Sequence, residues 1–316
     1  MKTFTQASSP GRGPHQDGVA LVVVLWMVAL LTIMAGSFSL STQRNTGLVK
    51  NAQDRARGLA LADAGVHYAL LMLSHPDPLK RWRTDGTPYE AVLPGGRVRV
   101  AIFDESGKID LNAASEQTLR ALLDRLAGNE DLAAGLADKI LDWRDNDDLT
   151  RLHGAEAKDY QAEGKAYVPQ NKNFQALEEL QMVSGLTPAL YKTLEPLLTI
   201  YSGQDGINPQ KASAGTLRTV LGLDEKTVAD YVELRRVTPA NAPPPLPIPQ
   251  GAIHLNQGGE IAYTLFARAA EGGAGVKAVA RRQISRNNGA PFAFVSWKQQ
   301  FFAAEGGVEA ASAPRP

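Results

Sequence analysis

An apolar run near the N-terminus, residues 19–40, is the strongest hydrophobic pattern in the chain. No charged residue lies between Asp17 and Arg44. About 22 helical residues extend ~33 Å, which is enough to cross a hydrocarbon core of ~30 Å. Because lipid offers the backbone no hydrogen-bond partner, this run predicts a membrane-spanning helix.

The helical pattern continues beyond the apolar run. Residues recur at intervals of three or four, and all but one of them are apolar: Leu48, Ala52, Ala56, Leu59, Asp63, Val66, Leu70 and Leu73. This spacing predicts one stripe that faces a partner. Pro76 and Pro78 interrupt the pattern, so a helix of about 56 residues, ~84 Å long, is expected from Val19 to Ser74.

Strand-like and helical patterns follow the long helix. Alternation over residues 97–102 predicts a half-buried strand, residues 104–108 predict a turn, and residues 109–112 predict a short return strand. Helical spacing then predicts six helices, over residues 115–127, 130–143, 174–183, 187–198, 213–221 and 224–236. Ser115, Thr187 and Ser213 are suitable N-cap residues.

Two pieces of this helical block repeat. Ile109, Ser115 and the Thr-Leu-Arg at 118–120 recur 98 positions later as Ile207, Ser213 and the Thr-Leu-Arg at 216–218. We therefore expect two related helical units, each opening with an extended segment.

The rest of the chain returns to strand patterning. Residues 238–249 are proline-rich and predict an extended linker. Strands are expected over residues 252–256, 260–269, 276–284 and 292–298. Residues 303–316 are small and polar, which is typical of a disordered tail. Strand-forming sequence thus flanks a helical block, so the predicted fold class is α+β: a long N-terminal helix and an antiparallel sheet, with a large inserted all-α domain.

Charge separates the helical block from its surroundings. The whole chain is neutral, but residues 104–240 carry 15 basic and 23 acidic residues, a net charge of −8. This block should repel nucleic acid and attract cations. The chain has no cysteine, which excludes disulfides and thiolate metal sites.

The residues before the apolar run resemble a prepilin-type leader. Residues 1–18 are polar and end in Gly18, and the apolar run begins at Val19. A membrane peptidase would cut after Gly18 and leave Val19 as the mature N-terminus. An ordinary single-pass anchor without processing is the alternative, and Asp17 stands where a basic residue is more usual. A secretory signal peptide has a shorter apolar core.

The fifth residue of such a mature chain would be Val23. Pilins usually carry a glutamate at this position, where it pairs with the N-terminal amine of a neighbouring subunit. A carboxylate in lipid is costly unless it is paired, so an apolar residue fits a subunit at the end of a filament.

The densest candidate chemistry is an acidic segment at residues 142–156. Asp145, Asp147 and Asp148, with Glu156 after a short loop, could offer several oxygen ligands to one Ca²⁺ ion. Repulsion between these carboxylates could be relieved by a bound cation or by Arg144 and Arg151. The spacing does not match an EF-hand, and a solvated acidic loop is the alternative interpretation.

Enzyme chemistry has little support in the sequence. His153 and Glu156 could form a zinc pair, but there is no HExxH or GxSxG motif and no cysteine nucleophile. The segments 183–188 and 221–225 resemble the hairpins of helix-hairpin-helix modules, which hold DNA phosphates through two glycines. Thr187 and Asp224 replace the second glycine, and an aspartate would repel a phosphate, so no nucleic-acid partner is expected.

With these parts assembled, the chain resembles the minor pseudopilin K family of type II secretion systems. The similarity covers essentially the whole chain. It rests on the apolar segment 18–31, GKIDLN at 107–112, the acidic segment 142–156, the LEEL-containing segment 174–201, and FAFVSWK at 292–298.

The resemblance implies a pilin-like α/β domain with an inserted helical domain of a SAM-like or helix-hairpin-helix-like kind. It divides the chain into a leader (1–18), a membrane segment (19–40), the first pilin-like part (41–103), the insertion (104–240), the second pilin-like part (241–302) and the tail (303–316).

The resemblance also implies a location and partners. The protein would be a structural component at the tip of a periplasmic pseudopilus that initiates or caps assembly, in a complex with minor pseudopilins I, J and H. It would be processed by the prepilin peptidase, methylated at the new N-terminus, and anchored once in the inner membrane with its N-terminus in the cytoplasm. Family members lack the fifth-position glutamate, as Val23 does here. A calcium site in the helical domain would fall on Asp145, Asp147 and Glu156, with Asp148 beside them.

Two other classes remain as alternatives. A minor pilin of a type IV or DNA-uptake pilus would show DNA affinity in the helical domain. A membrane-anchored metal-dependent hydrolase would lose turnover when Asp147 is replaced by alanine.

Overall fold

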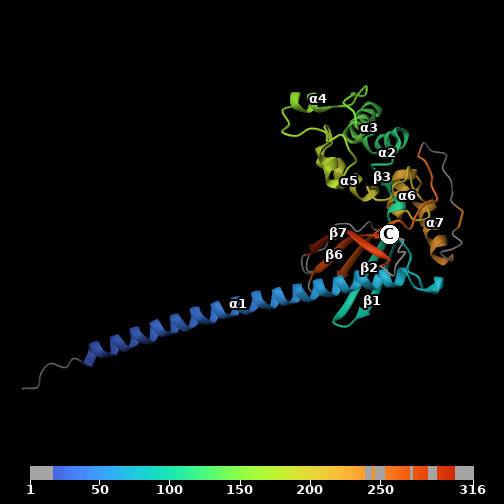
Figure 1. Ribbon diagram of the computed structural model, residues 1–316. Helices are drawn as coiled ribbons and strands as arrows, with labels where there is room; N and C mark the ends of the chain where they lie inside the picture. The colour runs from blue at the N-terminus through green and yellow to red at the C-terminus, as the bar shows by residue number, and fades with distance from the viewer. Residues whose placement is uncertain (1–16, 239–243, 246–252, 271–272, 284–289, 303–316) are drawn as a thin grey trace, which may run out of the picture. The chain divides into compact units, whose positions relative to one another are not determined.

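A single long helix, α1 (Asp17–Leu73), carries the N-terminal part of the chain. The computed structural model describes residues 17–238, 244–245, 253–270, 273–283 and 290–302 (Figure 1). The helix expected from Val19 to Ser74 is confirmed to within two residues at either end. The predicted leader up to residue 16, most of the proline-rich linker and the tail lie outside the described residues.

The chain divides into two compact units, residues 1–54 and 55–316. The first contains the apolar part of α1, whose large side chains from Leu21 onward are exposed; Trp26, for example, is 74% exposed. The helix from Leu21 is long and apolar enough to cross a membrane, with a mean hydropathy of 2.4 in its most apolar window.

In the second unit, the last part of α1 packs on a sheet through a face of alanine, valine and leucine. Its buried positions there include Leu61, Ala62, Val66, Ala69 and Leu73. A Cβ atom on Gly65 would lie 2.7 Å from Cγ2 of Val98, so the helix and the sheet approach more closely than a larger side chain allows. Of the predicted stripe, Val66 and Leu73 are buried in this face and Leu70 is partly buried against the same core, whereas Asp63 is exposed.

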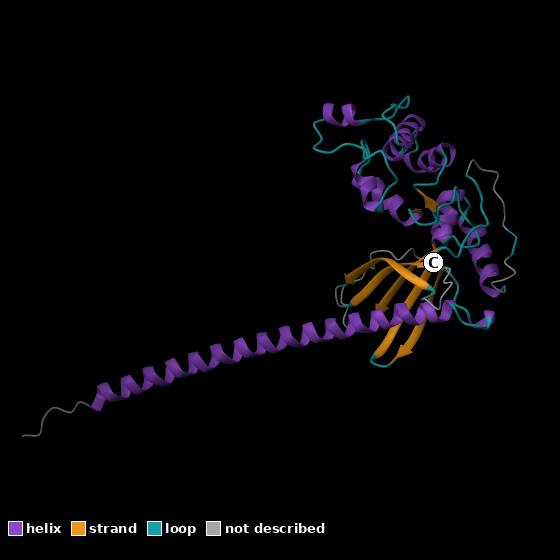
Figure 2. Ribbon diagram, in the orientation of Figure 1, coloured by secondary structure: helices purple, strands orange, loops and turns teal. Residues whose placement is uncertain are grey.

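The sheet has five antiparallel strands in the order β1-β2-β5-β6-β7, coloured orange in Figure 2. They are β1 (Asp85–Leu93), β2 (Gly96–Asp104), β5 (Ala262–Ala269), β6 (Ala274–Arg282) and β7 (Phe292–Phe301). The predicted antiparallel sheet is confirmed, and the alternation over residues 97–102 is part of β2. Buried apolar residues of β2, β5 and β6 form one core with α1.

The chain leaves this sheet after β2 and returns at β5, and the two crossing points are neighbours. Asp104 pairs with Tyr263 in the register of the two strands. The Asp104 carboxylate accepts hydrogen bonds from the amide of Ser106, on the outgoing chain, and from the amide of Glu260, on the returning chain, at 3.0 and 2.8 Å. One side chain therefore ties both ends of the intervening segment to the sheet.

The segment between β2 and β5 forms a separate helical domain with its own core. Its elements are α2 (Glu116–Ala127), α3 (Glu130–Arg144), α4 (Ala157–Ala162), α5 (Pro188–Leu194), α6 (Ala214–Leu221), α7 (Glu225–Val237), and the 3-10 helices η2 (Glu105–Gly107), η3 (Leu177–Met182) and η4 (Glu195–Leu197). Two short strands, β3 (Ile109–Asp110) and β4 (Leu198–Thr199), pair in parallel inside it.

The internal repeat is a pair of similar helix hairpins. Ser115 and Ser213 cap α2 and α6 through Thr118 and Thr216 respectively. Each first helix ends at a left-handed glycine, Gly128 or Gly222. With α2 of 12 residues and α6 of 8, the second unit is shorter by about one turn.

Several predicted elements differ from the structure. Helix 174–183 is only the 3-10 helix η3, and helix 187–198 is divided into α5, η4 and β4 because Pro196 cannot donate to the helix. The return strand at 109–112 pairs with β4, not with β2. In place of a strand at 252–256, the described residues show a single bridge between Ile207 and Leu255. Strand β1 and helix α4 were not predicted.

Candidate functional site

The acidic segment begins at the C-terminal end of α3, next to a cluster of aromatic side chains. Asn129 caps the helix by accepting from the amide of Leu132, and the amide of Asp145 bonds to Leu141 O where the helix ends. Trp143, fully buried, lies 6.1 Å from Phe174 between ring centroids and 5.8 Å from Tyr160. This cluster fixes the end of α3 and therefore the start of the acidic loop.

Arg151 holds two carboxylates of the loop together. Its Nη1 donates to Asp142 Oδ1 at 2.7 Å and also to Asp145. Asp142 is fully buried, and burial raises its pKa against the opposing effect of Arg151. Although burial alone lowers the pKa of Arg151, the hydrogen bonds to Asp145 and Asp142 raise it above its usual value. A cation therefore already lies between these two carboxylates.

Glu156 is the most unusual group of the site. Its side chain is 2% exposed, and neither carboxylate oxygen has a hydrogen-bond donor among the described residues. Burial, and after it the negative charge of Asp142 and Asp145, raises the pKa of Glu156 to about 7. Only its backbone is engaged, with the amide donating to Asp159 Oδ2 at 2.9 Å. A buried carboxylate without donors is costly, so this group lacks a partner that would stabilise its charge.

The two other predicted ligands lie on the outer part of the loop. Asp147 and Asp148 are exposed. Oδ1 of Asp147 accepts from the amide of Leu149 at 2.9 Å, and Oδ1 of Asp148 accepts from Nδ2 of Asn171 at 2.8 Å. Their charges also contribute to the raised pKa of Glu156, although less than those of Asp142 and Asp145.

The structure thus brings the four predicted ligands into one loop but not into a coordination shell. Among the described residues, no three histidine, aspartate or glutamate side chains converge closely enough to hold a metal ion. The donor set nevertheless suits Ca²⁺: both oxygens of Glu156 and Oδ1 of Asp145 are buried and lack hydrogen-bond donors. The calcium site stays a prediction, with Arg151 as the competing cation.

Sequence reasoning missed two residues and misassigned a third. Asp142 is one of the two carboxylates that Arg151 holds. Gly154 allows the loop to pack against Asp142, since a Cβ atom on Gly154 would lie 1.8 Å from Asp142 Oδ2. The glycine two residues before Glu156 was the available signal. Arg144, expected to relieve the acidic repulsion, instead donates to the carbonyls of Leu111 and Ala114.

Both residues that replace a hairpin glycine are helix caps. Thr187 accepts from the amide of Leu190, and Asp224 accepts from the amide of Thr227. The carboxylate of Asp224 therefore occupies the helix N-terminus at which a nucleic-acid phosphate would otherwise bind.

The N-terminal candidates lie on α1. Gly18 and Val19 fall in the first turn of the described helix. Val23 is 53% exposed and lies among other exposed apolar residues. Val23 is therefore part of an apolar helix surface. Cleavage after Gly18 stays a prediction.

Comparison with known proteins gives a consistent result. The family model of type II secretion system (T2SS), protein K, matches residues 100–203. The type II secretion system protein K of Pseudomonas aeruginosa is 29% identical over 243 residues, which cover 70% of this chain and 72% of that protein. The protein of the same name from Klebsiella pneumoniae is 26% identical over 252 residues, covering 72% and 76%.

The fold has a counterpart among solved structures. A chain in the crystal structure of the GspK-GspI-GspJ complex from the enterotoxigenic Escherichia coli type 2 secretion system matches with a TM-score of 0.53 and 17% identity. The match covers 82% of this chain and 99% of that chain.

A long apolar helix, a five-stranded antiparallel sheet and a helical insertion between β2 and β5 together make a pilin-like α+β fold, which the solved structure shares. The matched family segment, residues 100–203, covers the end of β2 and the part of the insertion up to β4. The chain is similar to the protein K family of type II secretion systems, the minor pseudopilins that the sequence resemblance predicted. That prediction, together with the α+β pilin-like fold, is confirmed.

Proposed function

We propose that this protein is the tip subunit of a type II secretion pseudopilus, where it initiates or caps assembly as a structural component and not as an enzyme. The main support for this proposal is the helical domain. It has its own core and stands on the sheet as an insertion between β2 and β5. A subunit with this additional domain would obstruct the stacking of a further subunit above it, and Val23 provides no carboxylate to capture such a subunit's amine.

Minor pseudopilins I and J are the proposed direct partners, with H as a further member of the tip complex. The support is the structural neighbour, which was solved as a complex of GspK with GspI and GspJ. Co-purification of the full chain with I and J from detergent-solubilised membranes tests this. A purified chain that retains J without I, or that retains neither, would contradict the proposed complex.

The proposed location is the inner membrane, crossed once by α1, with the N-terminus in the cytoplasm and the folded domains in the periplasm. The support is the family together with the apolar part of α1. The prepilin peptidase would cut after Gly18 and the new N-terminus would be methylated. N-terminal sequencing of membrane-extracted protein, from cells with and without the peptidase, tests the filament class itself. A chain that starts at Val19 only when the peptidase is present is the expected result, and an intact Met1 in both strains would rule out the filament mechanism.

Ca²⁺ is the proposed structural ion of the helical domain, held by Asp145 and Glu156 with Asp147 and Asp148 as further oxygen donors. The ion would supply the positive charge that the buried oxygens of Glu156 lack. An ion present at a hundredfold excess over its Kd stabilises the folded state by about 2.7 kcal/mol. We therefore expect a melting temperature several degrees higher in Ca²⁺ than in chelator.

Two variants make this test specific. Glu156→Gln should abolish the Ca²⁺-dependent shift, whereas Glu130→Gln, an exposed change in the same domain, should retain it. Equal melting temperatures of the unmodified protein in Ca²⁺ and in chelator would exclude a stabilising calcium site, and would leave the tip location unaffected.

A further inference from the structure

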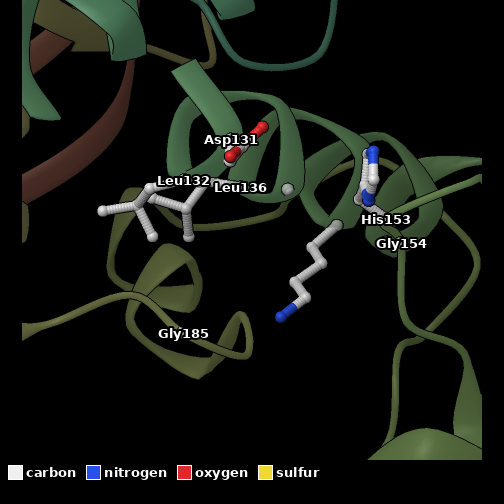
Figure 3. A pocket seen from close by; sticks show the side chains of 8 residues that line it. Asp131, Leu132, Leu136, His153, Gly154 and Gly185 are labelled. Carbon is white, nitrogen blue, oxygen red and sulfur yellow. The ribbon is translucent and has the colours of Figure 1, made fainter. Parts of the chain in front are cut away.

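Two adjoining hollows form one groove on the helical domain, outside the acidic cluster. Their volumes are about 400 and about 330 Å³, and they share Leu132, Leu136 and Gly185. Figure 3 shows the first hollow, with Leu132 and Leu136 of α3 on one side and His153 of the acidic loop on the other. The groove therefore runs between α3, the acidic loop and the segment that leads into α5.

One half of the groove is apolar. Leucine and alanine side chains of α2, α3 and α5 line it: Leu126, Ala127, Leu132, Leu136, Ala189 and Leu190. Leu132 is 47% exposed, although it lies in the first turn of a helix whose other leucines are buried. Leu126 and Leu190, which line the same hollow, are only partly buried, so together with Leu132 they leave apolar surface that a partner can cover.

The other half carries a cation, Lys139, whose charge adds slightly to the lowering of the Glu163 pKa by hydrogen bonds from Ser184 and Lys165. Lys139 lines the groove, and no hydrogen bond or ion pair to it occurs among the described residues. The surrounding domain has eight more acidic than basic residues. Although the net charge of the domain disfavours an anionic partner, Lys139 is a local positive charge with which an acidic group of another chain can pair at close range.

Gly185 keeps this cation accessible. A Cβ atom at Gly185 would lie 3.6 Å from both Leu136 Cδ2 and Lys139 Nζ, so a side chain here would fill the junction of the two halves. Gly135 and Gly154 also line the first hollow. Because Gly135 and Gly185 lack side chains beside the lining residues His153 and Lys139, the backbone of a bound segment can approach the groove closely there.

The charges along α3 give the groove a direction. Asp131 and Lys139 both line it and lie eight residues apart on the helix, which corresponds to ~12 Å along the axis. An acidic side chain is attracted at the Lys139 end and repelled at the Asp131 end.

We propose that this groove docks an extended segment of a partner protein in which an aliphatic side chain is followed by an acidic one. The aliphatic side chain occupies the hollow between Leu132 and Leu190, and the carboxylate pairs with Lys139. This mode resembles other peptide-recognition sites, in which an apolar anchor gives affinity and a charge gives orientation. The groove goes beyond the proposed tip role, since neither the membrane anchor nor the calcium loop requires it.

The test uses the full chain in lipid nanodiscs and three fluorescein-labelled heptapeptides, with the cores Leu-Leu-Glu, Leu-Leu-Gln and Ser-Ser-Glu in a Gly-Ser frame. Fluorescence anisotropy gives their affinities. We expect saturable binding of the Leu-Leu-Glu peptide and about tenfold weaker binding of each of the other two.

Variants then assign the two contacts. Lys139→Gln should remove the preference for Leu-Leu-Glu over Leu-Leu-Gln, and Leu132→Ser should weaken both leucine peptides equally. Lys226→Gln, an exposed lysine of α7, is the matched control and should change nothing. All three sites are exposed or line the groove, and circular dichroism checks that each variant is folded. Absence of saturable binding to the unmodified chain, equal affinity for the Glu and Gln peptides, or an unchanged affinity in Lys139→Gln would overturn the proposal.

Discussion

Arg235 of α7 and Asp85 of β1 form a buried ion pair between the helical domain and the sheet. Nε of Arg235 lies 3.1 Å from Oδ2 of Asp85, and the two side chains are 4% and 7% exposed. The orientation does not make a hydrogen bond at Nε, but Nη1 donates to three backbone carbonyls, those of Pro209, Gln210 and Ala212. Burial lowers the pKa of Arg235, and the charge of Asp85 opposes this change.

Replacing Arg235 by methionine should be strongly destabilising. The change leaves the Asp85 carboxylate buried without its cation, which typically costs about 3 kcal/mol or more. Thermal unfolding of the full chain in detergent would show a large decrease in melting temperature. The double variant Arg235→Met with Asp85→Leu should recover part of the loss, because no uncompensated charge remains. A single variant as stable as the unmodified protein would show that the pair contributes nothing.

A second connection between domain and sheet should be much weaker. Lys298 of β7 bonds to Glu178 of η3, with side chains 53% and 50% exposed. Exposed pairs contribute about 0–1 kcal/mol, so Lys298→Gln should change the melting temperature only slightly. The hydrogen bond from Lys298 lowers the pKa of Glu178, so its small contribution is present at neutral pH and is lost as the pH falls through that lowered pKa. Added salt should reduce the effect further, and a loss as large as that of Arg235→Met would contradict this ranking.

Glu156 should give the protein an unusual pH dependence when calcium is absent. Its pKa rises from an ordinary 4.5 to about 7 on folding, so within this window the folded state binds more protons than the unfolded state. Stability in chelator should therefore fall as the pH rises from about 5 to about 7, and then level off. With Ca²⁺ present the dependence should reverse, since the ion binds the ionised carboxylate.

The variant Glu156→Gln separates this effect from the other titrating groups. It cannot lose a proton in this range, so its melting temperature in chelator should be flatter between about pH 5 and about pH 7. If the variant kept the slope of the unmodified protein, another group would be responsible.

Gly107 should be intolerant of even one methyl group. A Cβ atom there would lie 2.6 Å from the carbonyl carbon and oxygen of Lys211, which are backbone atoms that cannot rotate away. Gly107→Ala should cost about 1–3 kcal/mol through overpacking. Gly47→Ala is the matched control, because it lies in α1 with no atom within 4 Å of the added Cβ, and it should be neutral or slightly stabilising. Similar melting temperatures of the two variants would show that the Lys211 segment can move.

Features that depend on residues close together in the sequence could be predicted from it. The N-caps at Ser115, Thr187 and Ser213 depend on a side chain and an amide three residues away, and all three are confirmed. Alternation and proline positions likewise located β2 and the end of α1.

Features that depend on contacts between residues far apart in the sequence could not be predicted in the same way. The buried face of α1 is set by how closely β2 approaches Gly65, which periodicity does not contain. The same holds for Arg144, whose carbonyl partners lie about 30 residues earlier, and for Asp142, whose role depends on the fold of the loop around Gly154. Composition located the acidic loop, whereas the burial of Glu156 needed the structure.

The double use of Asp104 has an evolutionary consequence. Because this carboxylate fastens the outgoing chain at Ser106 and the returning chain at Glu260, the helical domain is attached where two adjacent strands already meet. Removing everything between would leave β2 and β5 as neighbours that a simple hairpin could join. Selection can therefore enlarge, exchange or delete the helical domain without changing the order of the strands in the sheet.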